Sequence, residues 1–166
     1  FRNRRLDGHV WPFLMVDACY IKVRHHGSIK SRSVLVVAGI NDTGRRELLT
    51  WRVGDVESEA TWGEVFAELR QRGIQGVQWV VSDGHAGIQA AATHYFCDAA
   101  WQRCWTHFIR NLLAKVSHKD KAVLGRELCA ARKIEDIKIC LAEAERIAQH
   151  WEQRYEKAAK QIRSEE

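Results

Sequence analysis

Two aspartates in this 166-residue chain stand where a carboxylate is unusual. Asp17 lies in the middle of the apolar run 11–21, and Asp83 follows another apolar run, immediately before Gly84. A carboxylate surrounded by apolar side chains is costly unless a cation or a hydrogen-bond donor compensates it. Two carboxylates that converge suit Mg²⁺ or Mn²⁺, and such ions promote phosphoryl transfer. The alternatives are an Asp17 paired with Arg or Lys, and an ordinary Asp-Gly turn at Asp83.

A second candidate site is the Cys-x-x-His pair formed by Cys104 and His107. A structural zinc ion needs four ligands, and this pair supplies two. The remaining ligands would have to come from Cys97, Cys129, His94 or His118. We therefore expect the pair to be close together without completing a zinc site.

The residues around Asp17 predict a meander of three antiparallel strands. In the run 11–21 the residues that would point to either face of a strand are mostly apolar, and Asp17 is the only charged one. This pattern is typical of a central strand buried on both faces. Residues 33–40 and 47–53 predict two further strands, joined by the tight turn 41–44. A turn at residues 26–28 would connect the first two strands.

Helical periodicity replaces the strand pattern after the meander. Apolar residues recur at helical spacing from Trp62 to Leu69, with Ser58 as the N-cap and Gly73 as the stop. The elements predicted next are a strand over 76–82, a helix over 85–95, a strand over 99–105 and a helix from Phe108 to Val116. This order predicts an α/β fold with a ribonuclease-H-like mixed sheet, whereas a doubly wound fold would alternate strand and helix from the start.

The last third of the chain predicts only helix. Apolar residues alternate at spacings of three and four from Ile134 to Ile162, without Pro or Gly. Such a heptad stripe predicts an uninterrupted helix that packs against a neighbouring helix or against another chain.

The net charge of +5 is distributed in blocks. Residues 1–56 carry ten Lys/Arg against five Asp/Glu, and residues 101–133 carry eight against two, on either side of the acidic block 57–100. Basic blocks favour a polyanionic partner such as nucleic acid, with ordinary solvated charge as the alternative. The candidate DNA-binding residues are Lys22, Arg24, Arg103, Arg110 and Lys115.

Four segments in order resemble a known family. They are residues 16–24 (VDACYIKVR), the strand 34–40 with the turn behind it, residues 81–87 (VSDGHAG) and residues 102–112 (QRCWTHFIRNL). This series resembles the mutator-type DDE transposases of bacterial insertion sequences, closely from Leu6 to Val116 and more loosely through the helical tail.

The resemblance implies a function and a set of site residues. Asp17 and Asp83 match the two catalytic, metal-binding aspartates, with Mg²⁺ or Mn²⁺ as cofactor, and Cys104 and His107 match a hallmark dyad of the family. The third acid, a Glu in an Asn-Ala-Ile-Glu-like context, has no match, so it is expected beyond residue 166. Residues 1–116 would then be an incomplete catalytic core, and residues 117–166 the start of a helical insertion. DNA, as transposon ends and target, and further copies of the chain are the expected partners.

We therefore expect a catalytic-core fragment of a DNA transposase that is inactive alone. One alternative is a ribonuclease-H-like nuclease whose third acid is Glu127, Glu135 or Asp136. The other is a truncated, non-catalytic regulator that binds DNA and dimerises through the stripe 134–162.

The composition also predicts a compartment. No apolar run approaches the roughly 18 residues of a membrane span, so no membrane partner is expected. Five cysteines without a CxxC pair indicate reduced thiols, hence a cytoplasmic protein. The first residue, Phe1, suggests that the chain was cut from a longer one.

Overall fold

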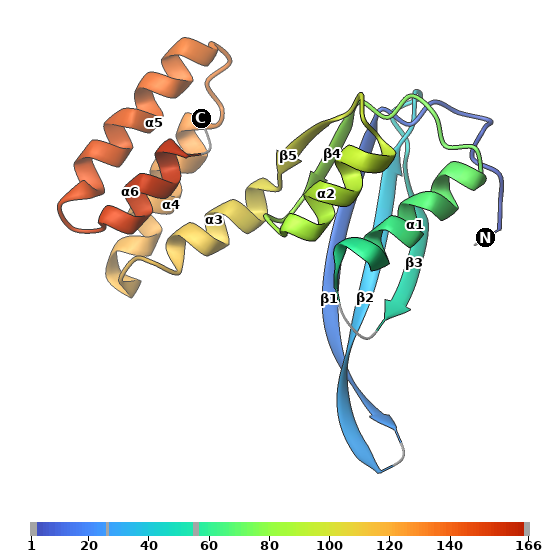
Figure 1. Ribbon diagram of the computed structural model, residues 1–166. Coiled ribbons are helices and arrows are strands. Elements are labelled where there is room, and N and C mark those ends of the chain that lie inside the picture. The colour runs from blue at the N-terminus through green and yellow to red at the C-terminus, as the bar shows by residue number, and fades with distance from the viewer. Residues whose placement is uncertain (1–2, 26, 55–56, 165–166) are drawn as a thin grey trace. The chain divides into compact units, whose positions relative to one another are not determined.

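The computed structural model describes residues 3–25, 27–54 and 57–164, which form two compact units. The first unit comprises residues 1–104 and the second comprises residues 105–166. All the strands belong to the first unit, and the second is helical (Figure 1). Among the described residues, no helix is both long and apolar enough to cross a membrane.

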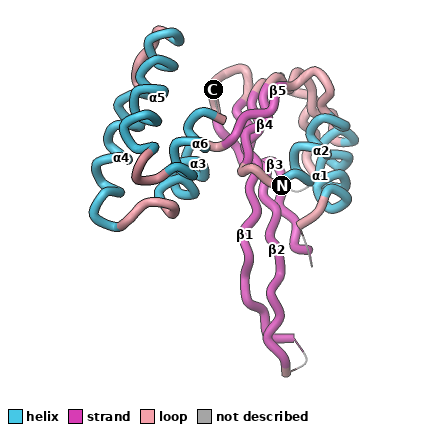
Figure 2. The backbone as a smooth tube through the Cα atoms, turned by 60° about the vertical axis from the view of Figure 1, so that its left-hand side comes forward, coloured by secondary structure: helices cyan, strands magenta, loops and turns pink. Residues whose placement is uncertain are grey.

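The first unit contains a five-stranded mixed sheet. Its strands are β1 (Phe13–His25), β2 (Ser28–Ile40), β3 (Arg46–Gly54), β4 (Trp79–Ser82) and β5 (Ala100–Arg103). The strand order is β3-β2-β1-β4-β5, in which β1, β2 and β3 pair antiparallel, while β4 lies parallel to β1 and to β5 (Figure 2). This is the predicted ribonuclease-H-like arrangement, a meander extended by two parallel strands.

Two helices, α1 (Glu59–Gln71) and α2 (Ala86–Tyr95), pack on one face of this sheet (Figure 2). Helix α1 begins as predicted at Ser58, whose side chain accepts a hydrogen bond from the Thr61 amide in a capping box. The chain leaves α1 at Gly73, where φ is +87°. The core of the unit lies between the sheet and these two helices. Its buried side chains include Leu14, Val16, Leu35, Val37, Trp62, Phe66 and Leu69.

The opposite face of the sheet is largely exposed, which corrects the prediction for the first strand. Leu14 and Val16 of β1 are buried, but Phe13 is 41% exposed and Asp17 is exposed as well. Trp51 of β3 and Trp79 of β4 also lie partly in solvent. The reason is that α1 and α2 both pack on the Leu14 side, so alternate β1 residues face away from the core.

Strands β1 and β2 are longer than the sequence predicts. Their antiparallel register is continuous from Phe13 opposite Ile40 to His25 opposite Ser28. Strand β3 pairs with β2 only from Ser33 onward, so residues 21–25 and 28–32 project beyond the sheet (Figures 1 and 2). We call this two-stranded projection the ribbon. Of the predicted turn 26–28, His26 lies outside the described residues, and Gly27 adopts a φ of +77°.

The second unit consists of four helices around a small apolar core. They are α3 (Trp105–Leu113), α4 (His118–Ala131), α5 (Ile137–Glu152) and α6 (Glu156–Arg163). The prediction of an uninterrupted helix from residue 134 to 162 is wrong, because the chain turns between Glu152 and Glu156. Whether residues 117–166 begin an insertion domain remains a prediction.

Polar contacts explain the break in the heptad stripe. The Tyr155 hydroxyl donates to Asp120 Oδ2 on α4 at 2.6 Å, which holds the turn against that helix. Arg163 then forms ion pairs with both Glu145 and Glu152, so α6 lies against α5. The stripe is therefore divided, with Ala148, Trp151, Ala158 and Ile162 buried inside the unit and Ile137 and Leu141 exposed.

The Tyr155–Asp120 hydrogen bond predicts a pH-dependent contribution to stability. It holds the pKa of the Asp120 carboxyl below its usual value, so the stabilisation is present above the pKa of the unfolded chain, near 4, and is lost as the pH falls. We expect Tyr155→Phe to lower the unfolding temperature by a few degrees at pH 7, and by less at pH 3. Thermal unfolding followed by circular dichroism measures both values.

Tyr95→Phe is the matched control, because the Tyr95 hydroxyl makes no hydrogen bond within the described part of the chain. If Tyr155→Phe lowered the unfolding temperature equally at both pH values, the hydrogen bond to an ionised Asp120 would not be what holds the turn.

Candidate active site

The pairing of β1 with β4 decides where the two aspartates lie. Its parallel register sets Leu14 opposite Val80 and Met15 opposite Val81. Continued by two residues, this register would set Asp17 level with Asp83, which directly follows the last residue of β4. Neighbouring strands are about 4.8 Å apart, so the two side chains start from adjacent positions.

Asp17 is more accessible than the sequence predicts. It lies on the exposed face, and its Oδ1 accepts a hydrogen bond from the amide of Ala18 at 2.9 Å. The prediction of a carboxylate buried on both sides of a central strand is therefore wrong. Because the carboxylate keeps contact with solvent, an incoming cation can reach it without a large desolvation cost.

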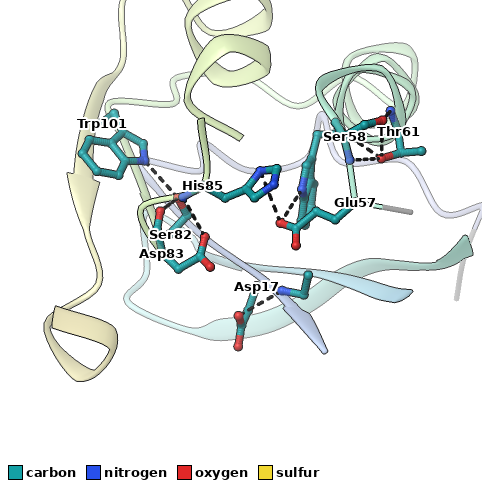
Figure 3. A network of polar contacts seen from close by, with 10 residues as sticks. Asp17, Glu57, Ser58, Thr61, Ser82, Asp83, His85 and Trp101 are labelled. Carbon is teal, nitrogen blue, oxygen red and sulfur yellow. Dashed lines mark hydrogen bonds and ion pairs between the residues drawn. The ribbon is translucent and has the colours of Figure 1, made fainter. Parts of the chain in front are cut away.

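Asp83 is fixed at the end of β4 by its neighbours. Its Oδ1 accepts a hydrogen bond from the His85 amide at 3.2 Å, and the preceding Ser82 hydroxyl accepts one from Trp101 Nε1 at 2.9 Å (Figure 3). The Ser82 carbonyl accepts from the Cys104 amide, which joins the end of β4 to the end of β5. These contacts hold the Asp83 carboxylate in one orientation.

Arg103 lies against the turn that follows Asp83. A Cβ atom added to Gly84 would stand 3.4 Å from the Arg103 guanidinium carbon, in ordinary van der Waals contact with it. Of the predicted DNA-binding residues, Arg103 is thus the one beside the aspartates. Lys22 and Arg24 lie in the ribbon, Arg110 is exposed on α3, and Lys115 donates to Gln161 Oε1 in the second unit.

Glu57 is a site residue that sequence reasoning missed. Its side chain is only 7% exposed, its Oε1 accepts from Trp62 Nε1 at 3.1 Å, and the same oxygen lies 3.8 Å from Nδ1 of His85 (Figure 3). The pair links the start of α1 to the turn that carries Asp83. The sequence does contain one sign of this role: Glu57 directly precedes the Ser58 N-cap, which places a carboxylate at the start of a helix.

The Cys104–His107 dyad spans the junction of the two units. Cys104 directly follows β5, and His107 lies in the first turn of α3. Within residues 3–25, 27–54 and 57–164, no group of three or more His, Cys, Asp or Glu side chains could hold a metal ion. The expectation that the dyad does not complete a zinc site stays a prediction.

The donor set at Asp17 and Asp83 fits a hard divalent cation. Carboxylate oxygens are the ligands that Mg²⁺ and Mn²⁺ prefer, and both aspartates have solvent-accessible surface. In each aspartate, one carboxylate oxygen accepts a hydrogen bond from a backbone amide, and this bond orients the side chain. Two such ligands make part of a site, and water or a phosphate oxygen would supply the others.

The family described as "Transposase, Mutator family" matches residues 1–166. The chain belongs to the mutator family of transposases. Over 139 residues it is 35% identical to the transposase for insertion sequence element IS256 in transposon Tn4001 of Staphylococcus aureus, covering 84% of this chain and 36% of that protein. Over 119 residues it is 41% identical to the transposase for ISRM5 of Rhizobium meliloti, covering 72% and 30%. The chain thus spans about a third of the length of these relatives.

Solved structures similar to this transposase-family chain include a transposase complex and an integrase catalytic core domain. The Drosophila P element transposase strand transfer complex matches with a TM-score of 0.40 and 14% identity, over 62% of this chain and 29% of the other. The HTLV-2 integrase catalytic core domain in complex with magnesium matches with a TM-score of 0.33 and 9% identity, over 81% and 84%.

The side-by-side aspartates predict a metal-dependent change in stability. Like charges facing each other on neighbouring strands are destabilising, so Asp83→Asn should raise the unfolding temperature slightly in EDTA. Mn²⁺ at ten times its dissociation constant should stabilise the unsubstituted chain by about 1.4 kcal/mol and leave Asp83→Asn almost unchanged. Differential scanning fluorimetry across a Mn²⁺ titration measures both effects.

Asp98→Asn, which removes an exposed carboxylate between α2 and β5, is the charge-matched control and should respond to Mn²⁺ like the unsubstituted chain. If Mn²⁺ stabilised Asp83→Asn equally well, the ion would be binding elsewhere.

Proposed function

We propose that this chain carries two of the metal-binding acids of a transposase that cleaves DNA strands and joins the released ends to target DNA. The observation that carries the proposal is the parallel register of β1 and β4, which, when continued, brings Asp17 of β1 level with Asp83 at the end of β4. Family membership supports the same reaction class, since transposases act on DNA.

The proposed chemistry is two successive phosphoryl transfers. In the first, water adds to a phosphorus atom at the transposon end and the bond to the 3′ oxygen breaks, which releases a 3′-hydroxyl. In the second, the oxygen of that hydroxyl bonds to the phosphorus of a target phosphodiester while the bond to the target strand's 3′ oxygen breaks, which leaves a new 3′-hydroxyl on the target. A bound divalent cation would neutralise phosphate charge and favour deprotonation of the attacking oxygen. Asp17 and Asp83 would hold it, and their backbone hydrogen bonds keep both carboxylates oriented.

Two further side chains are placed to meet the substrate. Arg103 lies against the Asp83–Gly84 turn, where a guanidinium suits a phosphate oxygen. His85 follows the same turn, and its Nδ1 lies 3.8 Å from Glu57 Oε1. We propose both as positioning residues for the phosphate, with Glu57 acting through His85.

The third acid of the family is proposed to lie outside residues 1–166. No third metal-ligating side chain groups with Asp17 and Asp83 in the described parts of the chain. In this proposal residues 1–116 are the incomplete core, residues 117–166 begin the insertion, and the complete enzyme works on transposon ends and target DNA as a homo-oligomer.

The structure does not favour the two alternatives. Glu127 accepts a hydrogen bond from Trp151 Nε1 at 2.7 Å, and Asp136 caps α5 by accepting from the amides of Lys138 and Ile139. These two candidates for an internal third acid are therefore used in building the second unit. The dimerisation stripe is divided between α5 and α6, and much of it is buried within that unit.

The proposal predicts that the 166-residue chain binds DNA but cleaves it poorly. Removing an essential member of a catalytic set leaves little activity, because such residues act as a unit. Incubated with supercoiled plasmid and Mn²⁺, the chain should give no more nicked product than Asp17→Ala or Asp83→Ala variants. Agarose gel electrophoresis over a time course quantifies the nicked form.

Robust nicking that both substitutions abolish would place the third ligand within residues 1–166 and support the nuclease alternative. Nicking that neither substitution reduces would indicate a contaminating nuclease, and a preparation of Asp17→Ala/Asp83→Ala detects it.

A further inference from the structure

The ribbon is basic and contains no acidic residue. Between Ala18 and Asn41 the chain has no Asp or Glu, and its four Lys/Arg residues all lie in the ribbon. They are Lys22 and Arg24 on β1, and Lys30 and Arg32 on β2. Lys22, Arg24 and Lys30 are exposed and form no ion pair within the described residues.

The register distributes these cations over both faces of the ribbon. Val23 lies opposite Lys30 and Ile21 opposite Arg32, so Lys30 and Arg32 share the face of Asp17. Lys22 and Arg24 alternate along β1 with Ile21 and Val23, so they point to the other face. On that face Arg24 lies opposite Ile29. A ribbon with cations on both faces presents positive charge to surfaces on either side of it.

The ribbon's dimensions suit a groove of duplex DNA. Five residues of strand are about 16 Å long, and two paired strands are about 5 Å apart. The major groove is about 12 Å wide and admits a two-stranded ribbon, with phosphates along both of its edges. Cations on both faces then contact the phosphates of both edges, which is a sequence-independent mode of binding.

The ribbon is also continuous with the candidate active site. A strand rises about 3.3 Å per residue, so along β1 the position opposite Arg32 is about 13 Å from Asp17. The position opposite Lys30 is about 20 Å from Asp17. A duplex that places a phosphate at Asp17 and follows this strand therefore passes both cations. No other paired strand intervenes, because β3 and β4 end before the ribbon begins.

We propose that the ribbon is a binding element for duplex DNA, inserted into a groove next to the site of cleavage. This inference rests on the proposed function for the position of the scissile phosphate, and on the ribbon's own charge for the choice of partner. A second copy of this chain is the competing occupant, since Ile29 is 65% exposed at the tip. Two ribbons without acidic residues repel each other, which favours DNA.

The test compares two variants of equal charge change by fluorescence anisotropy with a labelled 30-base-pair duplex. The ribbon variant is Lys22→Gln/Arg24→Gln/Lys30→Gln/Arg32→Gln. The control is Lys119→Gln/Lys133→Gln/Lys138→Gln/Lys157→Gln, all exposed positions of the second unit. We expect the ribbon variant to bind at least tenfold more weakly, and its slope of log K against log salt to be smaller by about 2–4. The control should change both by much less.

All binding is measured in EDTA, so the result does not depend on the metal site. An Asp17→Asn/Asp83→Asn variant should bind the duplex at least as well as the unsubstituted chain, which separates failure of the ribbon proposal from failure of the proposed chemistry. Far-UV circular dichroism checks that each variant is folded.

Photo-crosslinking identifies the occupant directly. p-Benzoylphenylalanine replaces Ile29, which is 65% exposed, or Ile137 of α5, which is 66% exposed and serves as the matched control. DNA crosslinks from position 29 that exceed those from position 137 support the proposal. Equal DNA binding by the two charge variants, or crosslinks from position 29 to a second protein chain alone, would overturn it.

Discussion

The short parallel pairing of β1 with β4 is the interaction on which the candidate site depends. Three residue pairs set the register that brings Asp17 level with Asp83. Two carboxylates at that spacing repel each other, so the pairing must be held by something other than the acids. It is held by the core beneath it, where Leu14, Val16 and Val80 are buried under α1 and α2. The apolar side of the sheet thus stabilises a charged arrangement on its other side.

Much of this arrangement follows from the sequence, because local patterns carry it. The Ser58 cap, the spacing from Trp62 to Leu69 and the stop at Gly73 define α1 without any tertiary information. The order of strands and helices then limits the topology to one that makes the Asp17 and Asp83 strands neighbours. Proposing Asp17 and Asp83 as a pair needed only that order, with one aspartate inside the first strand and the other directly after the fourth.

What the sequence did not predict depends on contacts between distant residues. The exposure of Asp17 arises because both helices pack on one face, and no local pattern encodes which face they choose. The turn between α5 and α6 is set by Tyr155 reaching Asp120, 35 positions away, within an unbroken heptad pattern. Glu57 meets His85 only once α1 and α2 are packed together. The first predicted strand ends at residue 21 and the second begins at residue 33, so the prediction misses most of the ribbon, whose two strands are paired only with each other.

The separation of the paired strands along the chain has a consequence for how the site forms. The β1–β2 hairpin joins residues a short distance apart, so its closure entropy is low and it can zip from the turn at Gly27. Asp17 and Asp83 are separated by 66 positions, and they meet only after β2, β3 and α1 have been made and the chain has returned. Folding therefore assembles the ribbon early and the two acids late. A chain interrupted during synthesis before residue 79 has the ribbon's sequence complete but lacks the strand that brings the second acid.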